Sequence, residues 1–259
     1  IIMTNRSLKA YINHRRGGSI FELDFVARGM NVTAGYASQR HTDPSVIEAG
    51  RSKMAFVDHL VAPQTTASDF VGGTMSELGD FVQGWYEYKV MKSKAGVKAM
   101  LSRQGSVVQG EKSCPLTMEK VFGFEGDRAD LSFVYQLGNQ TVTPYRFVFA
   151  TEMTFSLGGA VGGKALLRCG KEWYGALARE RVFLEGVTEV ALEDSQYGIR
   201  VLLKTQKPVQ VWCYPVGGGA GSNAAYQGTT LVIALPVTLG ANSLWSLMGK
   251  LMLRGIRRK

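Results

Sequence analysis

The chain has 259 residues, of which 45% are hydrophobic and 20% are charged, and this balance excludes an intrinsically disordered protein. The net charge is +9, but the cations are scattered and no RNP, zinc-finger or helix-turn-helix pattern accompanies them, so we do not expect nucleic-acid binding. No run approaches the roughly 18 consecutive apolar residues that a transmembrane helix needs.

Three cysteines stand far apart in the chain, at Cys114, Cys169 and Cys213. Their number is odd, and neither a Cys-x-x-Cys nor a His-x-x-x-His spacing is present, so the sequence does not predict a disulfide framework or a structural zinc site. Buried, unreactive thiols in a reducing compartment are the expected state, which indicates a cytoplasmic protein. We expect no metal and no cofactor.

Alternating apolar and polar residues dominate the pattern along the chain. Phe21, Leu23 and Phe25 alternate with acidic residues. Because successive side chains of a strand point to opposite faces, this spacing places one face in a core and the other in water. Turns that contain glycine or asparagine separate many of the later runs. In chain order, the further predicted strands cover residues 116–124, 129–137, 144–152, 187–193, 199–204, 208–216 and 229–236.

Three details of this strand pattern carry separate expectations. Residues 147–150 are apolar on both faces, as in a central strand that is covered on both sides. Lys207-Pro208 is expected to form a turn between two short strands. At the C-terminal end, Leu244, Leu247, Met248 and Leu251 fit a helix with a basic flank, while Trp245, Leu247, Leu251 and Leu253 fit one face of a closing strand.

Many strands with almost no helical periodicity predict an all-β fold, a two-sheet antiparallel β-sandwich that residues 1–259 form as a single domain. The irregular stretches 31–53, 60–80 and 156–180 are long, and long loops on a rigid scaffold often carry binding residues. Gly158 to Ala165 nearly matches the phosphate-binding P-loop. However, Ala165 has no hydroxyl to hold Mg²⁺ and no clear helix follows, so a glycine-rich loop is predicted there.

The residues with candidate chemistry lie between positions 58 and 85. His59 follows Asp58 at the end of an apolar run, where a buried structural histidine is the commoner outcome. Glu77 and Asp80 flank a turn, and Trp85 follows shortly after. Paired carboxylates can cleave a glycosidic bond and an aromatic ring can stack on a sugar, but the same residues are ordinary in a turn that leads into a strand.

Six segments in order along the chain can be compared with known families. They are Gly17-Gly18-Ser19-Ile20-Phe21-Glu22-Leu23-Asp24-Phe25, Phe56-Val57-Asp58-His59, Glu77-Leu78-Gly79-Asp80-Phe81, Pro115-Leu116-Thr117-Met118-Glu119-Lys120, Glu152 and Tyr226-Gln227-Gly228. In this order they resemble the C-terminal domain of family 57 glycoside hydrolases, which include 4-α-glucanotransferases and α-amylases. The resemblance covers nearly the whole chain.

This resemblance implies a galactose-mutarotase-like sandwich (a supersandwich) whose final segment is a strand entered through Trp245. The family's nucleophile and general acid lie in an N-terminal distorted (β/α) barrel, and no segment here matches that barrel. The resemblance therefore implies a non-catalytic domain. Its expected partners are a catalytic barrel, on the same or a separate chain, and an α-glucan oligosaccharide. The candidate contacts to barrel or carbohydrate are Asp58, His59, Glu77, Asp80 and Trp85.

Other interpretations stay open. Asn223-Ala224-Ala225 stands where the family usually has an acidic residue, which predicts weaker sugar binding if that acid contacts sugar. The opening Ile1-Ile2-Met3 indicates a fragment of a longer protein, while a free-standing carbohydrate-binding or regulatory module is the alternative. A less favoured alternative is a mutarotase-like epimerase that uses His59 with Glu77 or Asp80 as acid and base. A homo-oligomer is compatible with the sequence.

Overall fold

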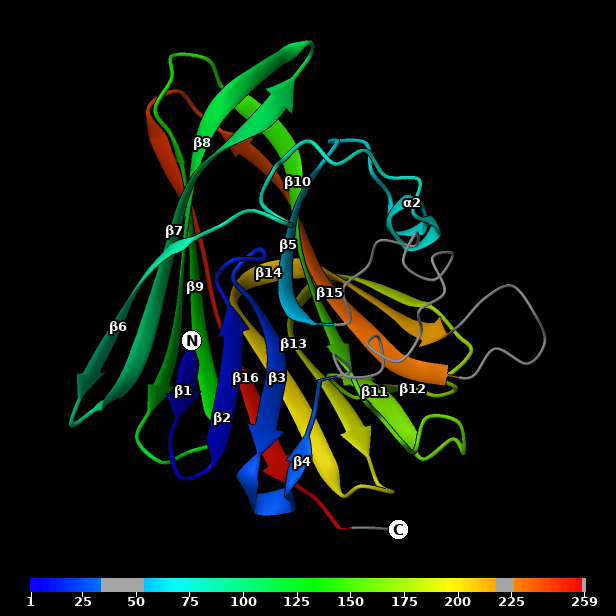
Figure 1. The fold of residues 1–259 in the computed structure, drawn as a ribbon. Helices are drawn as coiled ribbons and strands as arrows, with labels where there is room; N and C mark the ends of the chain where they lie inside the picture. Colours follow the sequence, from blue (N-terminus) through cyan, green and yellow to red (C-terminus); the bar gives the residue numbers. More distant parts are fainter. Residues whose placement is uncertain (34–53, 218–225, 258–259) are drawn as a thin grey trace, which may run out of the picture.

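The computed structural model describes residues 1–33, 54–217 and 226–257, and most of these residues lie in antiparallel strands (Figure 1). The elements in chain order are β1 Ile2–Thr4, β2 Leu8–Asn13, β3 Ser19–Phe25, the 3-10 turn η1 Val26–Arg28, β4 Met30–Asn31, β5 Ala55–Val61, α2 Ala67–Gly72, β6 Glu87–Ser93, β7 Gly96–Gln109, β8 Lys112–Glu125, β9 Asp130–Asn139, β10 Tyr145–Phe155, β11 Ala165–Cys169, β12 Glu172–Tyr174, β13 Val182–Asp194, β14 Ile199–Gly217, β15 Tyr226–Leu239 and β16 Ser243–Gly255.

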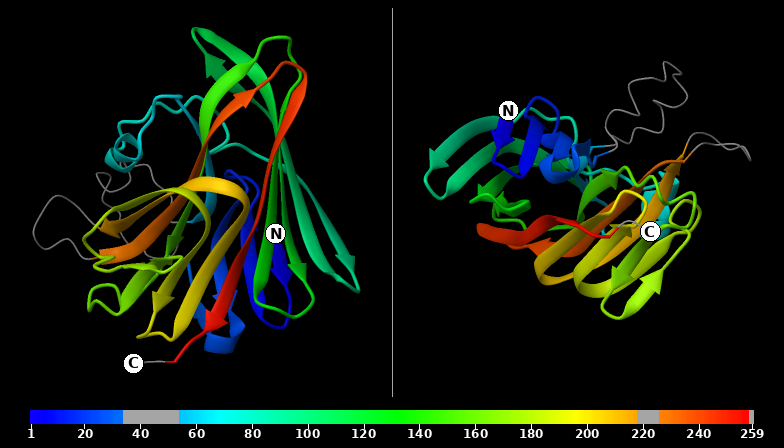
Figure 2. Two further views of the ribbon diagram at one scale, coloured as in Figure 1. Left: turned by 180° about the vertical axis from the view of Figure 1, so that it is seen from behind. Right: turned by 90° about the horizontal axis from the view of Figure 1, so that it is seen from below.

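The strands of the described residues are hydrogen-bonded into one continuous sheet. Its order is β1-β2-β3-β5-β10-β15-β14-β16-β9-β8-β7-β6, with β4 beside β3, β13 beside β14, and β11 and β12 beyond β13. The sheet curls until its two halves face each other across one core (Figure 2). Phe56 on β5 packs on Phe122 of β8 at 5.0 Å between ring centroids, and Phe149 on β10 packs on Tyr135 of β9 at the same distance. The all-β sandwich is confirmed, with two layers that are halves of one curled sheet.

Strand β14 joins the two halves, and the predicted turn at Lys207-Pro208 is wrong. The strand is unbroken from Ile199 to Gly217 and exchanges partners along its length. It pairs with β16 as far as Thr205 and with β15 from Gln210 onward. Pro208 lies between these two ladders, where a residue without an N–H loses no sheet hydrogen bond.

Two other sequence ambiguities are resolved by pairing. The C-terminal segment is strand β16, which lies between β9 and β14 and therefore has no helical character. The glycine-rich segment before β11 is a turn, held where the Gly159 amide donates to Asp194 Oδ2 at 2.9 Å. A strand follows this turn, which agrees with the rejection of a P-loop.

A second apolar cluster covers the face of β5, β10, β15 and β14 that points away from the main core. Its members include Val148, Ala150 and Trp212, so the strand at 147–150 is covered on both faces as predicted. Helix α2 packs on this face through Phe70, whose ring lies 5.2 Å from that of Trp212. The helix begins at a reciprocal capping box between Thr66 and Asp69. No helix in the described part of the chain is long and apolar enough to cross a membrane.

Candidate functional site

Strand β5 places His59 and its neighbour Asp58 on opposite faces of the sheet, because successive residues of a strand alternate. His59 points to the face that α2 covers, and its ring meets Phe70 edge-on at 5.2 Å. Nδ1 of His59 lies 2.7 Å from Oε2 of Glu77, so two of the predicted residues are brought together. The other oxygen of Glu77 accepts the Leu60 amide at 2.8 Å, which ties the turn after α2 to β5.

Glu152 completes this cluster from the neighbouring strand β10. Its Oε2 lies 3.5 Å from Nε2 of His59, and its Oε1 accepts the hydroxyl of Tyr214 at 2.9 Å. Neither Glu152 nor Tyr214 was among the predicted site residues. Two signals pointed to Glu152: it is one of the six segments that carry the family resemblance, and it is a lone carboxylate after the continuous apolar run at 147–150.

The electrostatics of the cluster favour a charged histidine. Burial disfavours the imidazolium, but the carboxylates of Glu152 and Glu77 on either side outweigh it and raise the pKa of His59 to about 9. The ring is 5% exposed, so the charge is held inside the protein at neutral pH. The two carboxylates flank opposite ring nitrogens, and no group of metal-binding side chains converges on one point within the described residues.

Asp58 points into the main core, where it meets a buried cation and a phenol. Its Oδ2 lies 2.6 Å from Nζ of Lys120, and its Oδ1 accepts the hydroxyl of Tyr135 at 2.7 Å. Lys120 also donates to the carbonyl of Gly17 at 2.5 Å. Burial lowers the pKa of Lys120, although the charge of Asp58 opposes the change. Burial, assisted by Asp58, raises the pKa of Tyr135 well above its usual value.

Asp80 is engaged elsewhere, so the structure separates the two carboxylates that flank the predicted turn. Its Oδ2 lies 2.6 Å from Nη2 of Arg103, while Glu77 pairs with His59. Arg103 also donates to the carbonyl of Trp85 at 3.2 Å. Asp80 and Trp85 are thereby linked through one guanidinium group on β7.

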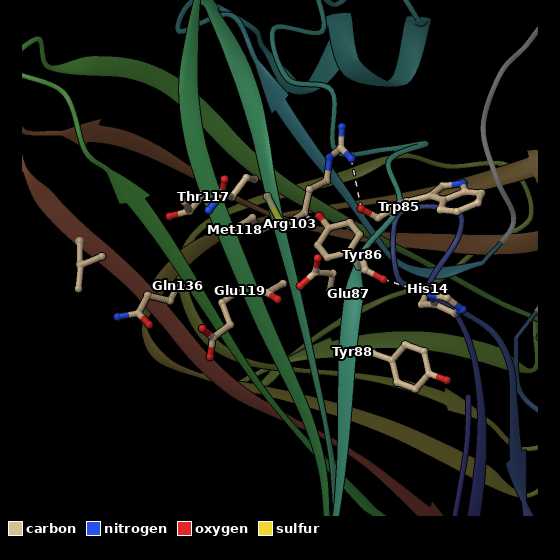
Figure 3. A pocket seen from close by; sticks show the side chains of 13 residues that line it. His14, Trp85, Tyr86, Glu87, Tyr88, Arg103, Thr117, Met118, Glu119 and Gln136 are labelled. Atoms are coloured by element: carbon tan, nitrogen blue, oxygen red, sulfur yellow. Dashed lines mark hydrogen bonds between the residues drawn. The ribbon is translucent and has the colours of Figure 1, made fainter.

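Trp85 lies at a groove of about 1060 Å³ formed by β6, β7, β8, β9 and the segment before β6. Its side chain is 66% exposed, and Arg15 lies over its ring at 5.3 Å. Figure 3 shows Trp85 and Tyr88 on one side of the groove, with Glu119 and Gln136 on the other. The groove thus combines exposed aromatic rings with hydrogen-bonding side chains, which is the composition of a binding surface for a polar ring compound.

The backbone around Trp85 is fixed from both sides. The Gly17 amide donates to the Gly84 carbonyl at 2.9 Å, and the Tyr86 amide donates to the His14 carbonyl at 2.8 Å. A Cβ at Gly84 would lie 2.4 Å from Nε of Arg103, so a larger residue there would displace the Arg103 side chain. The carbonyl of the same Gly17 accepts a hydrogen bond from Lys120, so the buried Asp58 network and the groove share one anchoring segment.

Comparison with known proteins gives a consistent result. The profile of the family described as "Alpha-amylase/4-alpha-glucanotransferase, C-terminal" matches residues 36–248. A 4-alpha-glucanotransferase from Thermococcus litoralis is 24% identical over an alignment of 274 positions, and this alignment covers 92% of this chain and 37% of that enzyme. The chain therefore spans little more than a third of the length of this relative. The residues of the Asn223-Ala224-Ala225 departure lie outside the described residues.

Solved structures agree on the fold. The crystal structure of the Thermococcus litoralis 4-alpha-glucanotransferase matches with a TM-score of 0.69 at 21% identity, over 97% of this chain and 37% of that one. A galactose mutarotase-like protein from Clostridium acetobutylicum matches with a TM-score of 0.67 at 10% identity, over 98% and 95% of the two chains. A galactose 1-epimerase from Lactobacillus acidophilus NCFM gives 0.62 at 10% identity, over 98% and 93%. The galactose-mutarotase-like architecture predicted from sequence is confirmed.

Proposed function

The chain belongs to the C-terminal domain family of alpha-amylases and 4-alpha-glucanotransferases, and from that premise we propose that it supports the catalytic barrel of an enzyme acting on α-glucans and contacts the carbohydrate. The observation that carries the proposal is the coverage. The match takes in 92% of this chain but 37% of a 4-alpha-glucanotransferase, so most of the length of that relative lies outside the matching part. We assign a catalytic barrel to that remaining length of the relative. The barrel that this domain supports would be on the same chain as the domain or on a separate chain.

The site residues divide between the two parts of this role. Asp58, His59 and Glu77 are bound to partners inside the domain, and their proposed task is to hold β5 and the turn after α2 in place for an interface. Glu77 has the most accessible side chain of the three, at 29% exposure, and is the one a barrel residue would reach. Trp85 lines the groove, which is the proposed carbohydrate contact, and Asp80 holds Arg103 of the same groove.

The supporting role is tested in the parent enzyme that carries this domain. Removal of the domain is expected to lower the melting temperature of the remaining barrel and to abolish its activity on amylose. Addition of the 259-residue chain in trans is expected to restore part of both. A barrel that stays fully folded and active without the domain would show that the supporting role is wrong.

The carbohydrate contact is tested on the chain itself by isothermal titration with maltoheptaose, an α-1,4-linked oligosaccharide. Saturable binding is expected because the groove offers exposed aromatic rings and polar side chains. The absence of heat at millimolar sugar would remove the carbohydrate contact from the proposal and leave the supporting role in place.

A second candidate, epimerisation at the anomeric carbon of a sugar, draws on one observation. His59 and Glu77 are an acid and a base in direct contact on a scaffold shared with a galactose 1-epimerase. The histidine ring is buried and is already hydrogen-bonded to its base, which disfavours a reaction with a sugar. Polarimetry of freshly dissolved glucose decides the matter, because a rate equal to the buffer rate would eliminate this candidate.

A further inference from the structure

We infer that the outer face of β6 to β9 is a binding surface for an extended segment of neutral α-glucan, with Trp85 as the stacking platform at one side. The identity of the sugar rests on the proposed function above. The surface itself is defined by the groove and by a row of polar side chains that crosses four strands. It is separate from the buried His59 and Asp58 clusters.

The polar row follows from strand register. Glu87 on β6 is opposite Ser102 on β7, Ser102 is opposite Glu119 on β8, and Glu119 is opposite Gln136 on β9. Residues paired in this way project from the same face of a sheet, and neighbouring strands are about 4.8 Å apart. The row therefore extends over roughly 14 Å, which is longer than a single sugar ring requires.

The chemistry of the row favours a neutral ligand that is rich in hydroxyl groups. Within the described part of the chain, the side-chain carboxylates of Glu87 and Glu119 make no hydrogen bond or ion pair, so both can accept hydroxyl donors. The guanidinium of Arg103, in contrast, is held by Asp80. An anionic ligand would meet two unpaired carboxylates and one neutralised cation, which is unfavourable.

The backbone that carries Trp85 is held in place before any ligand binds. Arg103 donates to the backbone carbonyl of Trp85 at 3.2 Å, and Arg15 lies over the Trp85 ring at 5.3 Å. A segment whose backbone is already held loses little backbone freedom on binding, so more of the contact energy is available as affinity. The arrangement therefore suits stacking on the flat face of a sugar.

The experiment uses isothermal titration of the whole chain with maltoheptaose, with maltose and with a lysine-rich peptide. Trp85→Ala is expected to raise the Kd for maltoheptaose at least about fivefold, since it removes the stacking platform. Glu119→Gln is expected to raise it about threefold, because a charged acceptor becomes a weaker neutral one. Maltose is expected to bind more weakly than maltoheptaose because it cannot span the row.

Two matched variants provide the controls. Trp173→Ala removes a similarly exposed tryptophan. Trp173 is on β12, away from the groove, and Arg168 of β11 lies over its ring. Glu185→Gln removes an exposed carboxylate on β13. Both should leave the Kd within about twofold of the unmodified chain, and near-ultraviolet circular dichroism should show that all four variants are folded.

The outcomes separate the two proposals. Maltoheptaose binding that is unchanged by Trp85→Ala and Glu119→Gln would overturn the groove and leave the carbohydrate contact intact. No binding by the unmodified chain would overturn both. Binding of a lysine-rich peptide that is lost in Glu119→Gln, with no binding of maltoheptaose, would assign the groove to a cationic partner and overturn the inference.

Discussion

Nζ of Lys120 lies 2.6 Å from Oδ2 of Asp58, and both side chains are completely buried. The two residues are 62 positions apart and meet because β5 and β8 face each other across the core. Tyr135 and the carbonyl of Gly17 satisfy further hydrogen-bonding positions of the pair. A buried pair of this kind makes the orientation of β5 specific, because any other packing leaves a charge without a partner.

Lys120→Met is therefore expected to destabilise the protein by about 3–5 kcal/mol, since it leaves the Asp58 carboxylate buried without its cation. The free energy of unfolding from urea denaturation measures the change. Lys98→Met, which alters an exposed lysine on β7, is the control and should change stability by about 0.5 kcal/mol or less. The double variant Asp58→Asn/Lys120→Met should recover part of the loss, and a single variant as stable as the control would contradict this account.

The His59 cluster predicts a pH dependence of stability. The pKa of His59 rises from 6.5 to about 9 on folding, so the protonated ring stabilises the folded state. This contribution is complete below about pH 6.5 and is lost as the pH rises through about 9, with a total of about 3 kcal/mol. His59→Gln should remove this slope between about pH 6.5 and 9.

The measurement is the free energy of unfolding as a function of pH for the unmodified chain and for His59→Gln. His14→Gln, which changes a histidine outside the cluster, should retain the slope. NMR titration of the His59 ring provides an independent readout. A midpoint near the ordinary value of 6.5 would show that Glu77 and Glu152 do not hold the charge.

The glycine at position 17 provides a test of close packing. Gly17 has a φ of 64°, and a Cβ at this position would lie 2.4 Å from the carbonyl oxygen of Val82. Gly110 has a similar φ of 62°, but a Cβ there would meet no other atom within 4 Å. Gly110→Ala should therefore cost only the left-handed backbone strain of about 1–2 kcal/mol, and Gly17→Ala should cost clearly more. Equal losses in urea denaturation would refute the close contact.

Thiol reactivity is expected to divide the three cysteines. Burial raises the pKa of Cys213 to about 12, so it carries almost no thiolate at about pH 8, while Cys114 and Cys169 are only partly buried. Ellman's reagent at this pH should label the native chain slowly at Cys213 and faster at the other two. Cys213→Ala should leave the fast phase unchanged, and guanidinium should expose all three thiols. A fast phase that Cys213→Ala diminishes would disagree with this burial.

The strand pattern could be predicted from local sequence because alternation is a local property. The segments at 116–124, 129–137 and 144–152 correspond to β8, β9 and β10, which extend a few residues further. The error at Lys207-Pro208 has a physical reason. A proline indicates a turn only when the chain reverses, whereas here it lies where a long strand changes partners.

The sequence by itself determined the all-β class, the family and the short list of polar residues around β5. Periodicity and the order of motifs are properties of the linear chain, so they can be recognised without knowledge of any contact. The tertiary structure alone decided which residues meet. Glu152 joins His59, Lys120 joins Asp58, and Arg103 joins Asp80 because strand register and the curl of the sheet bring distant positions together. Such pairings depend on long-range packing, which no local pattern encodes.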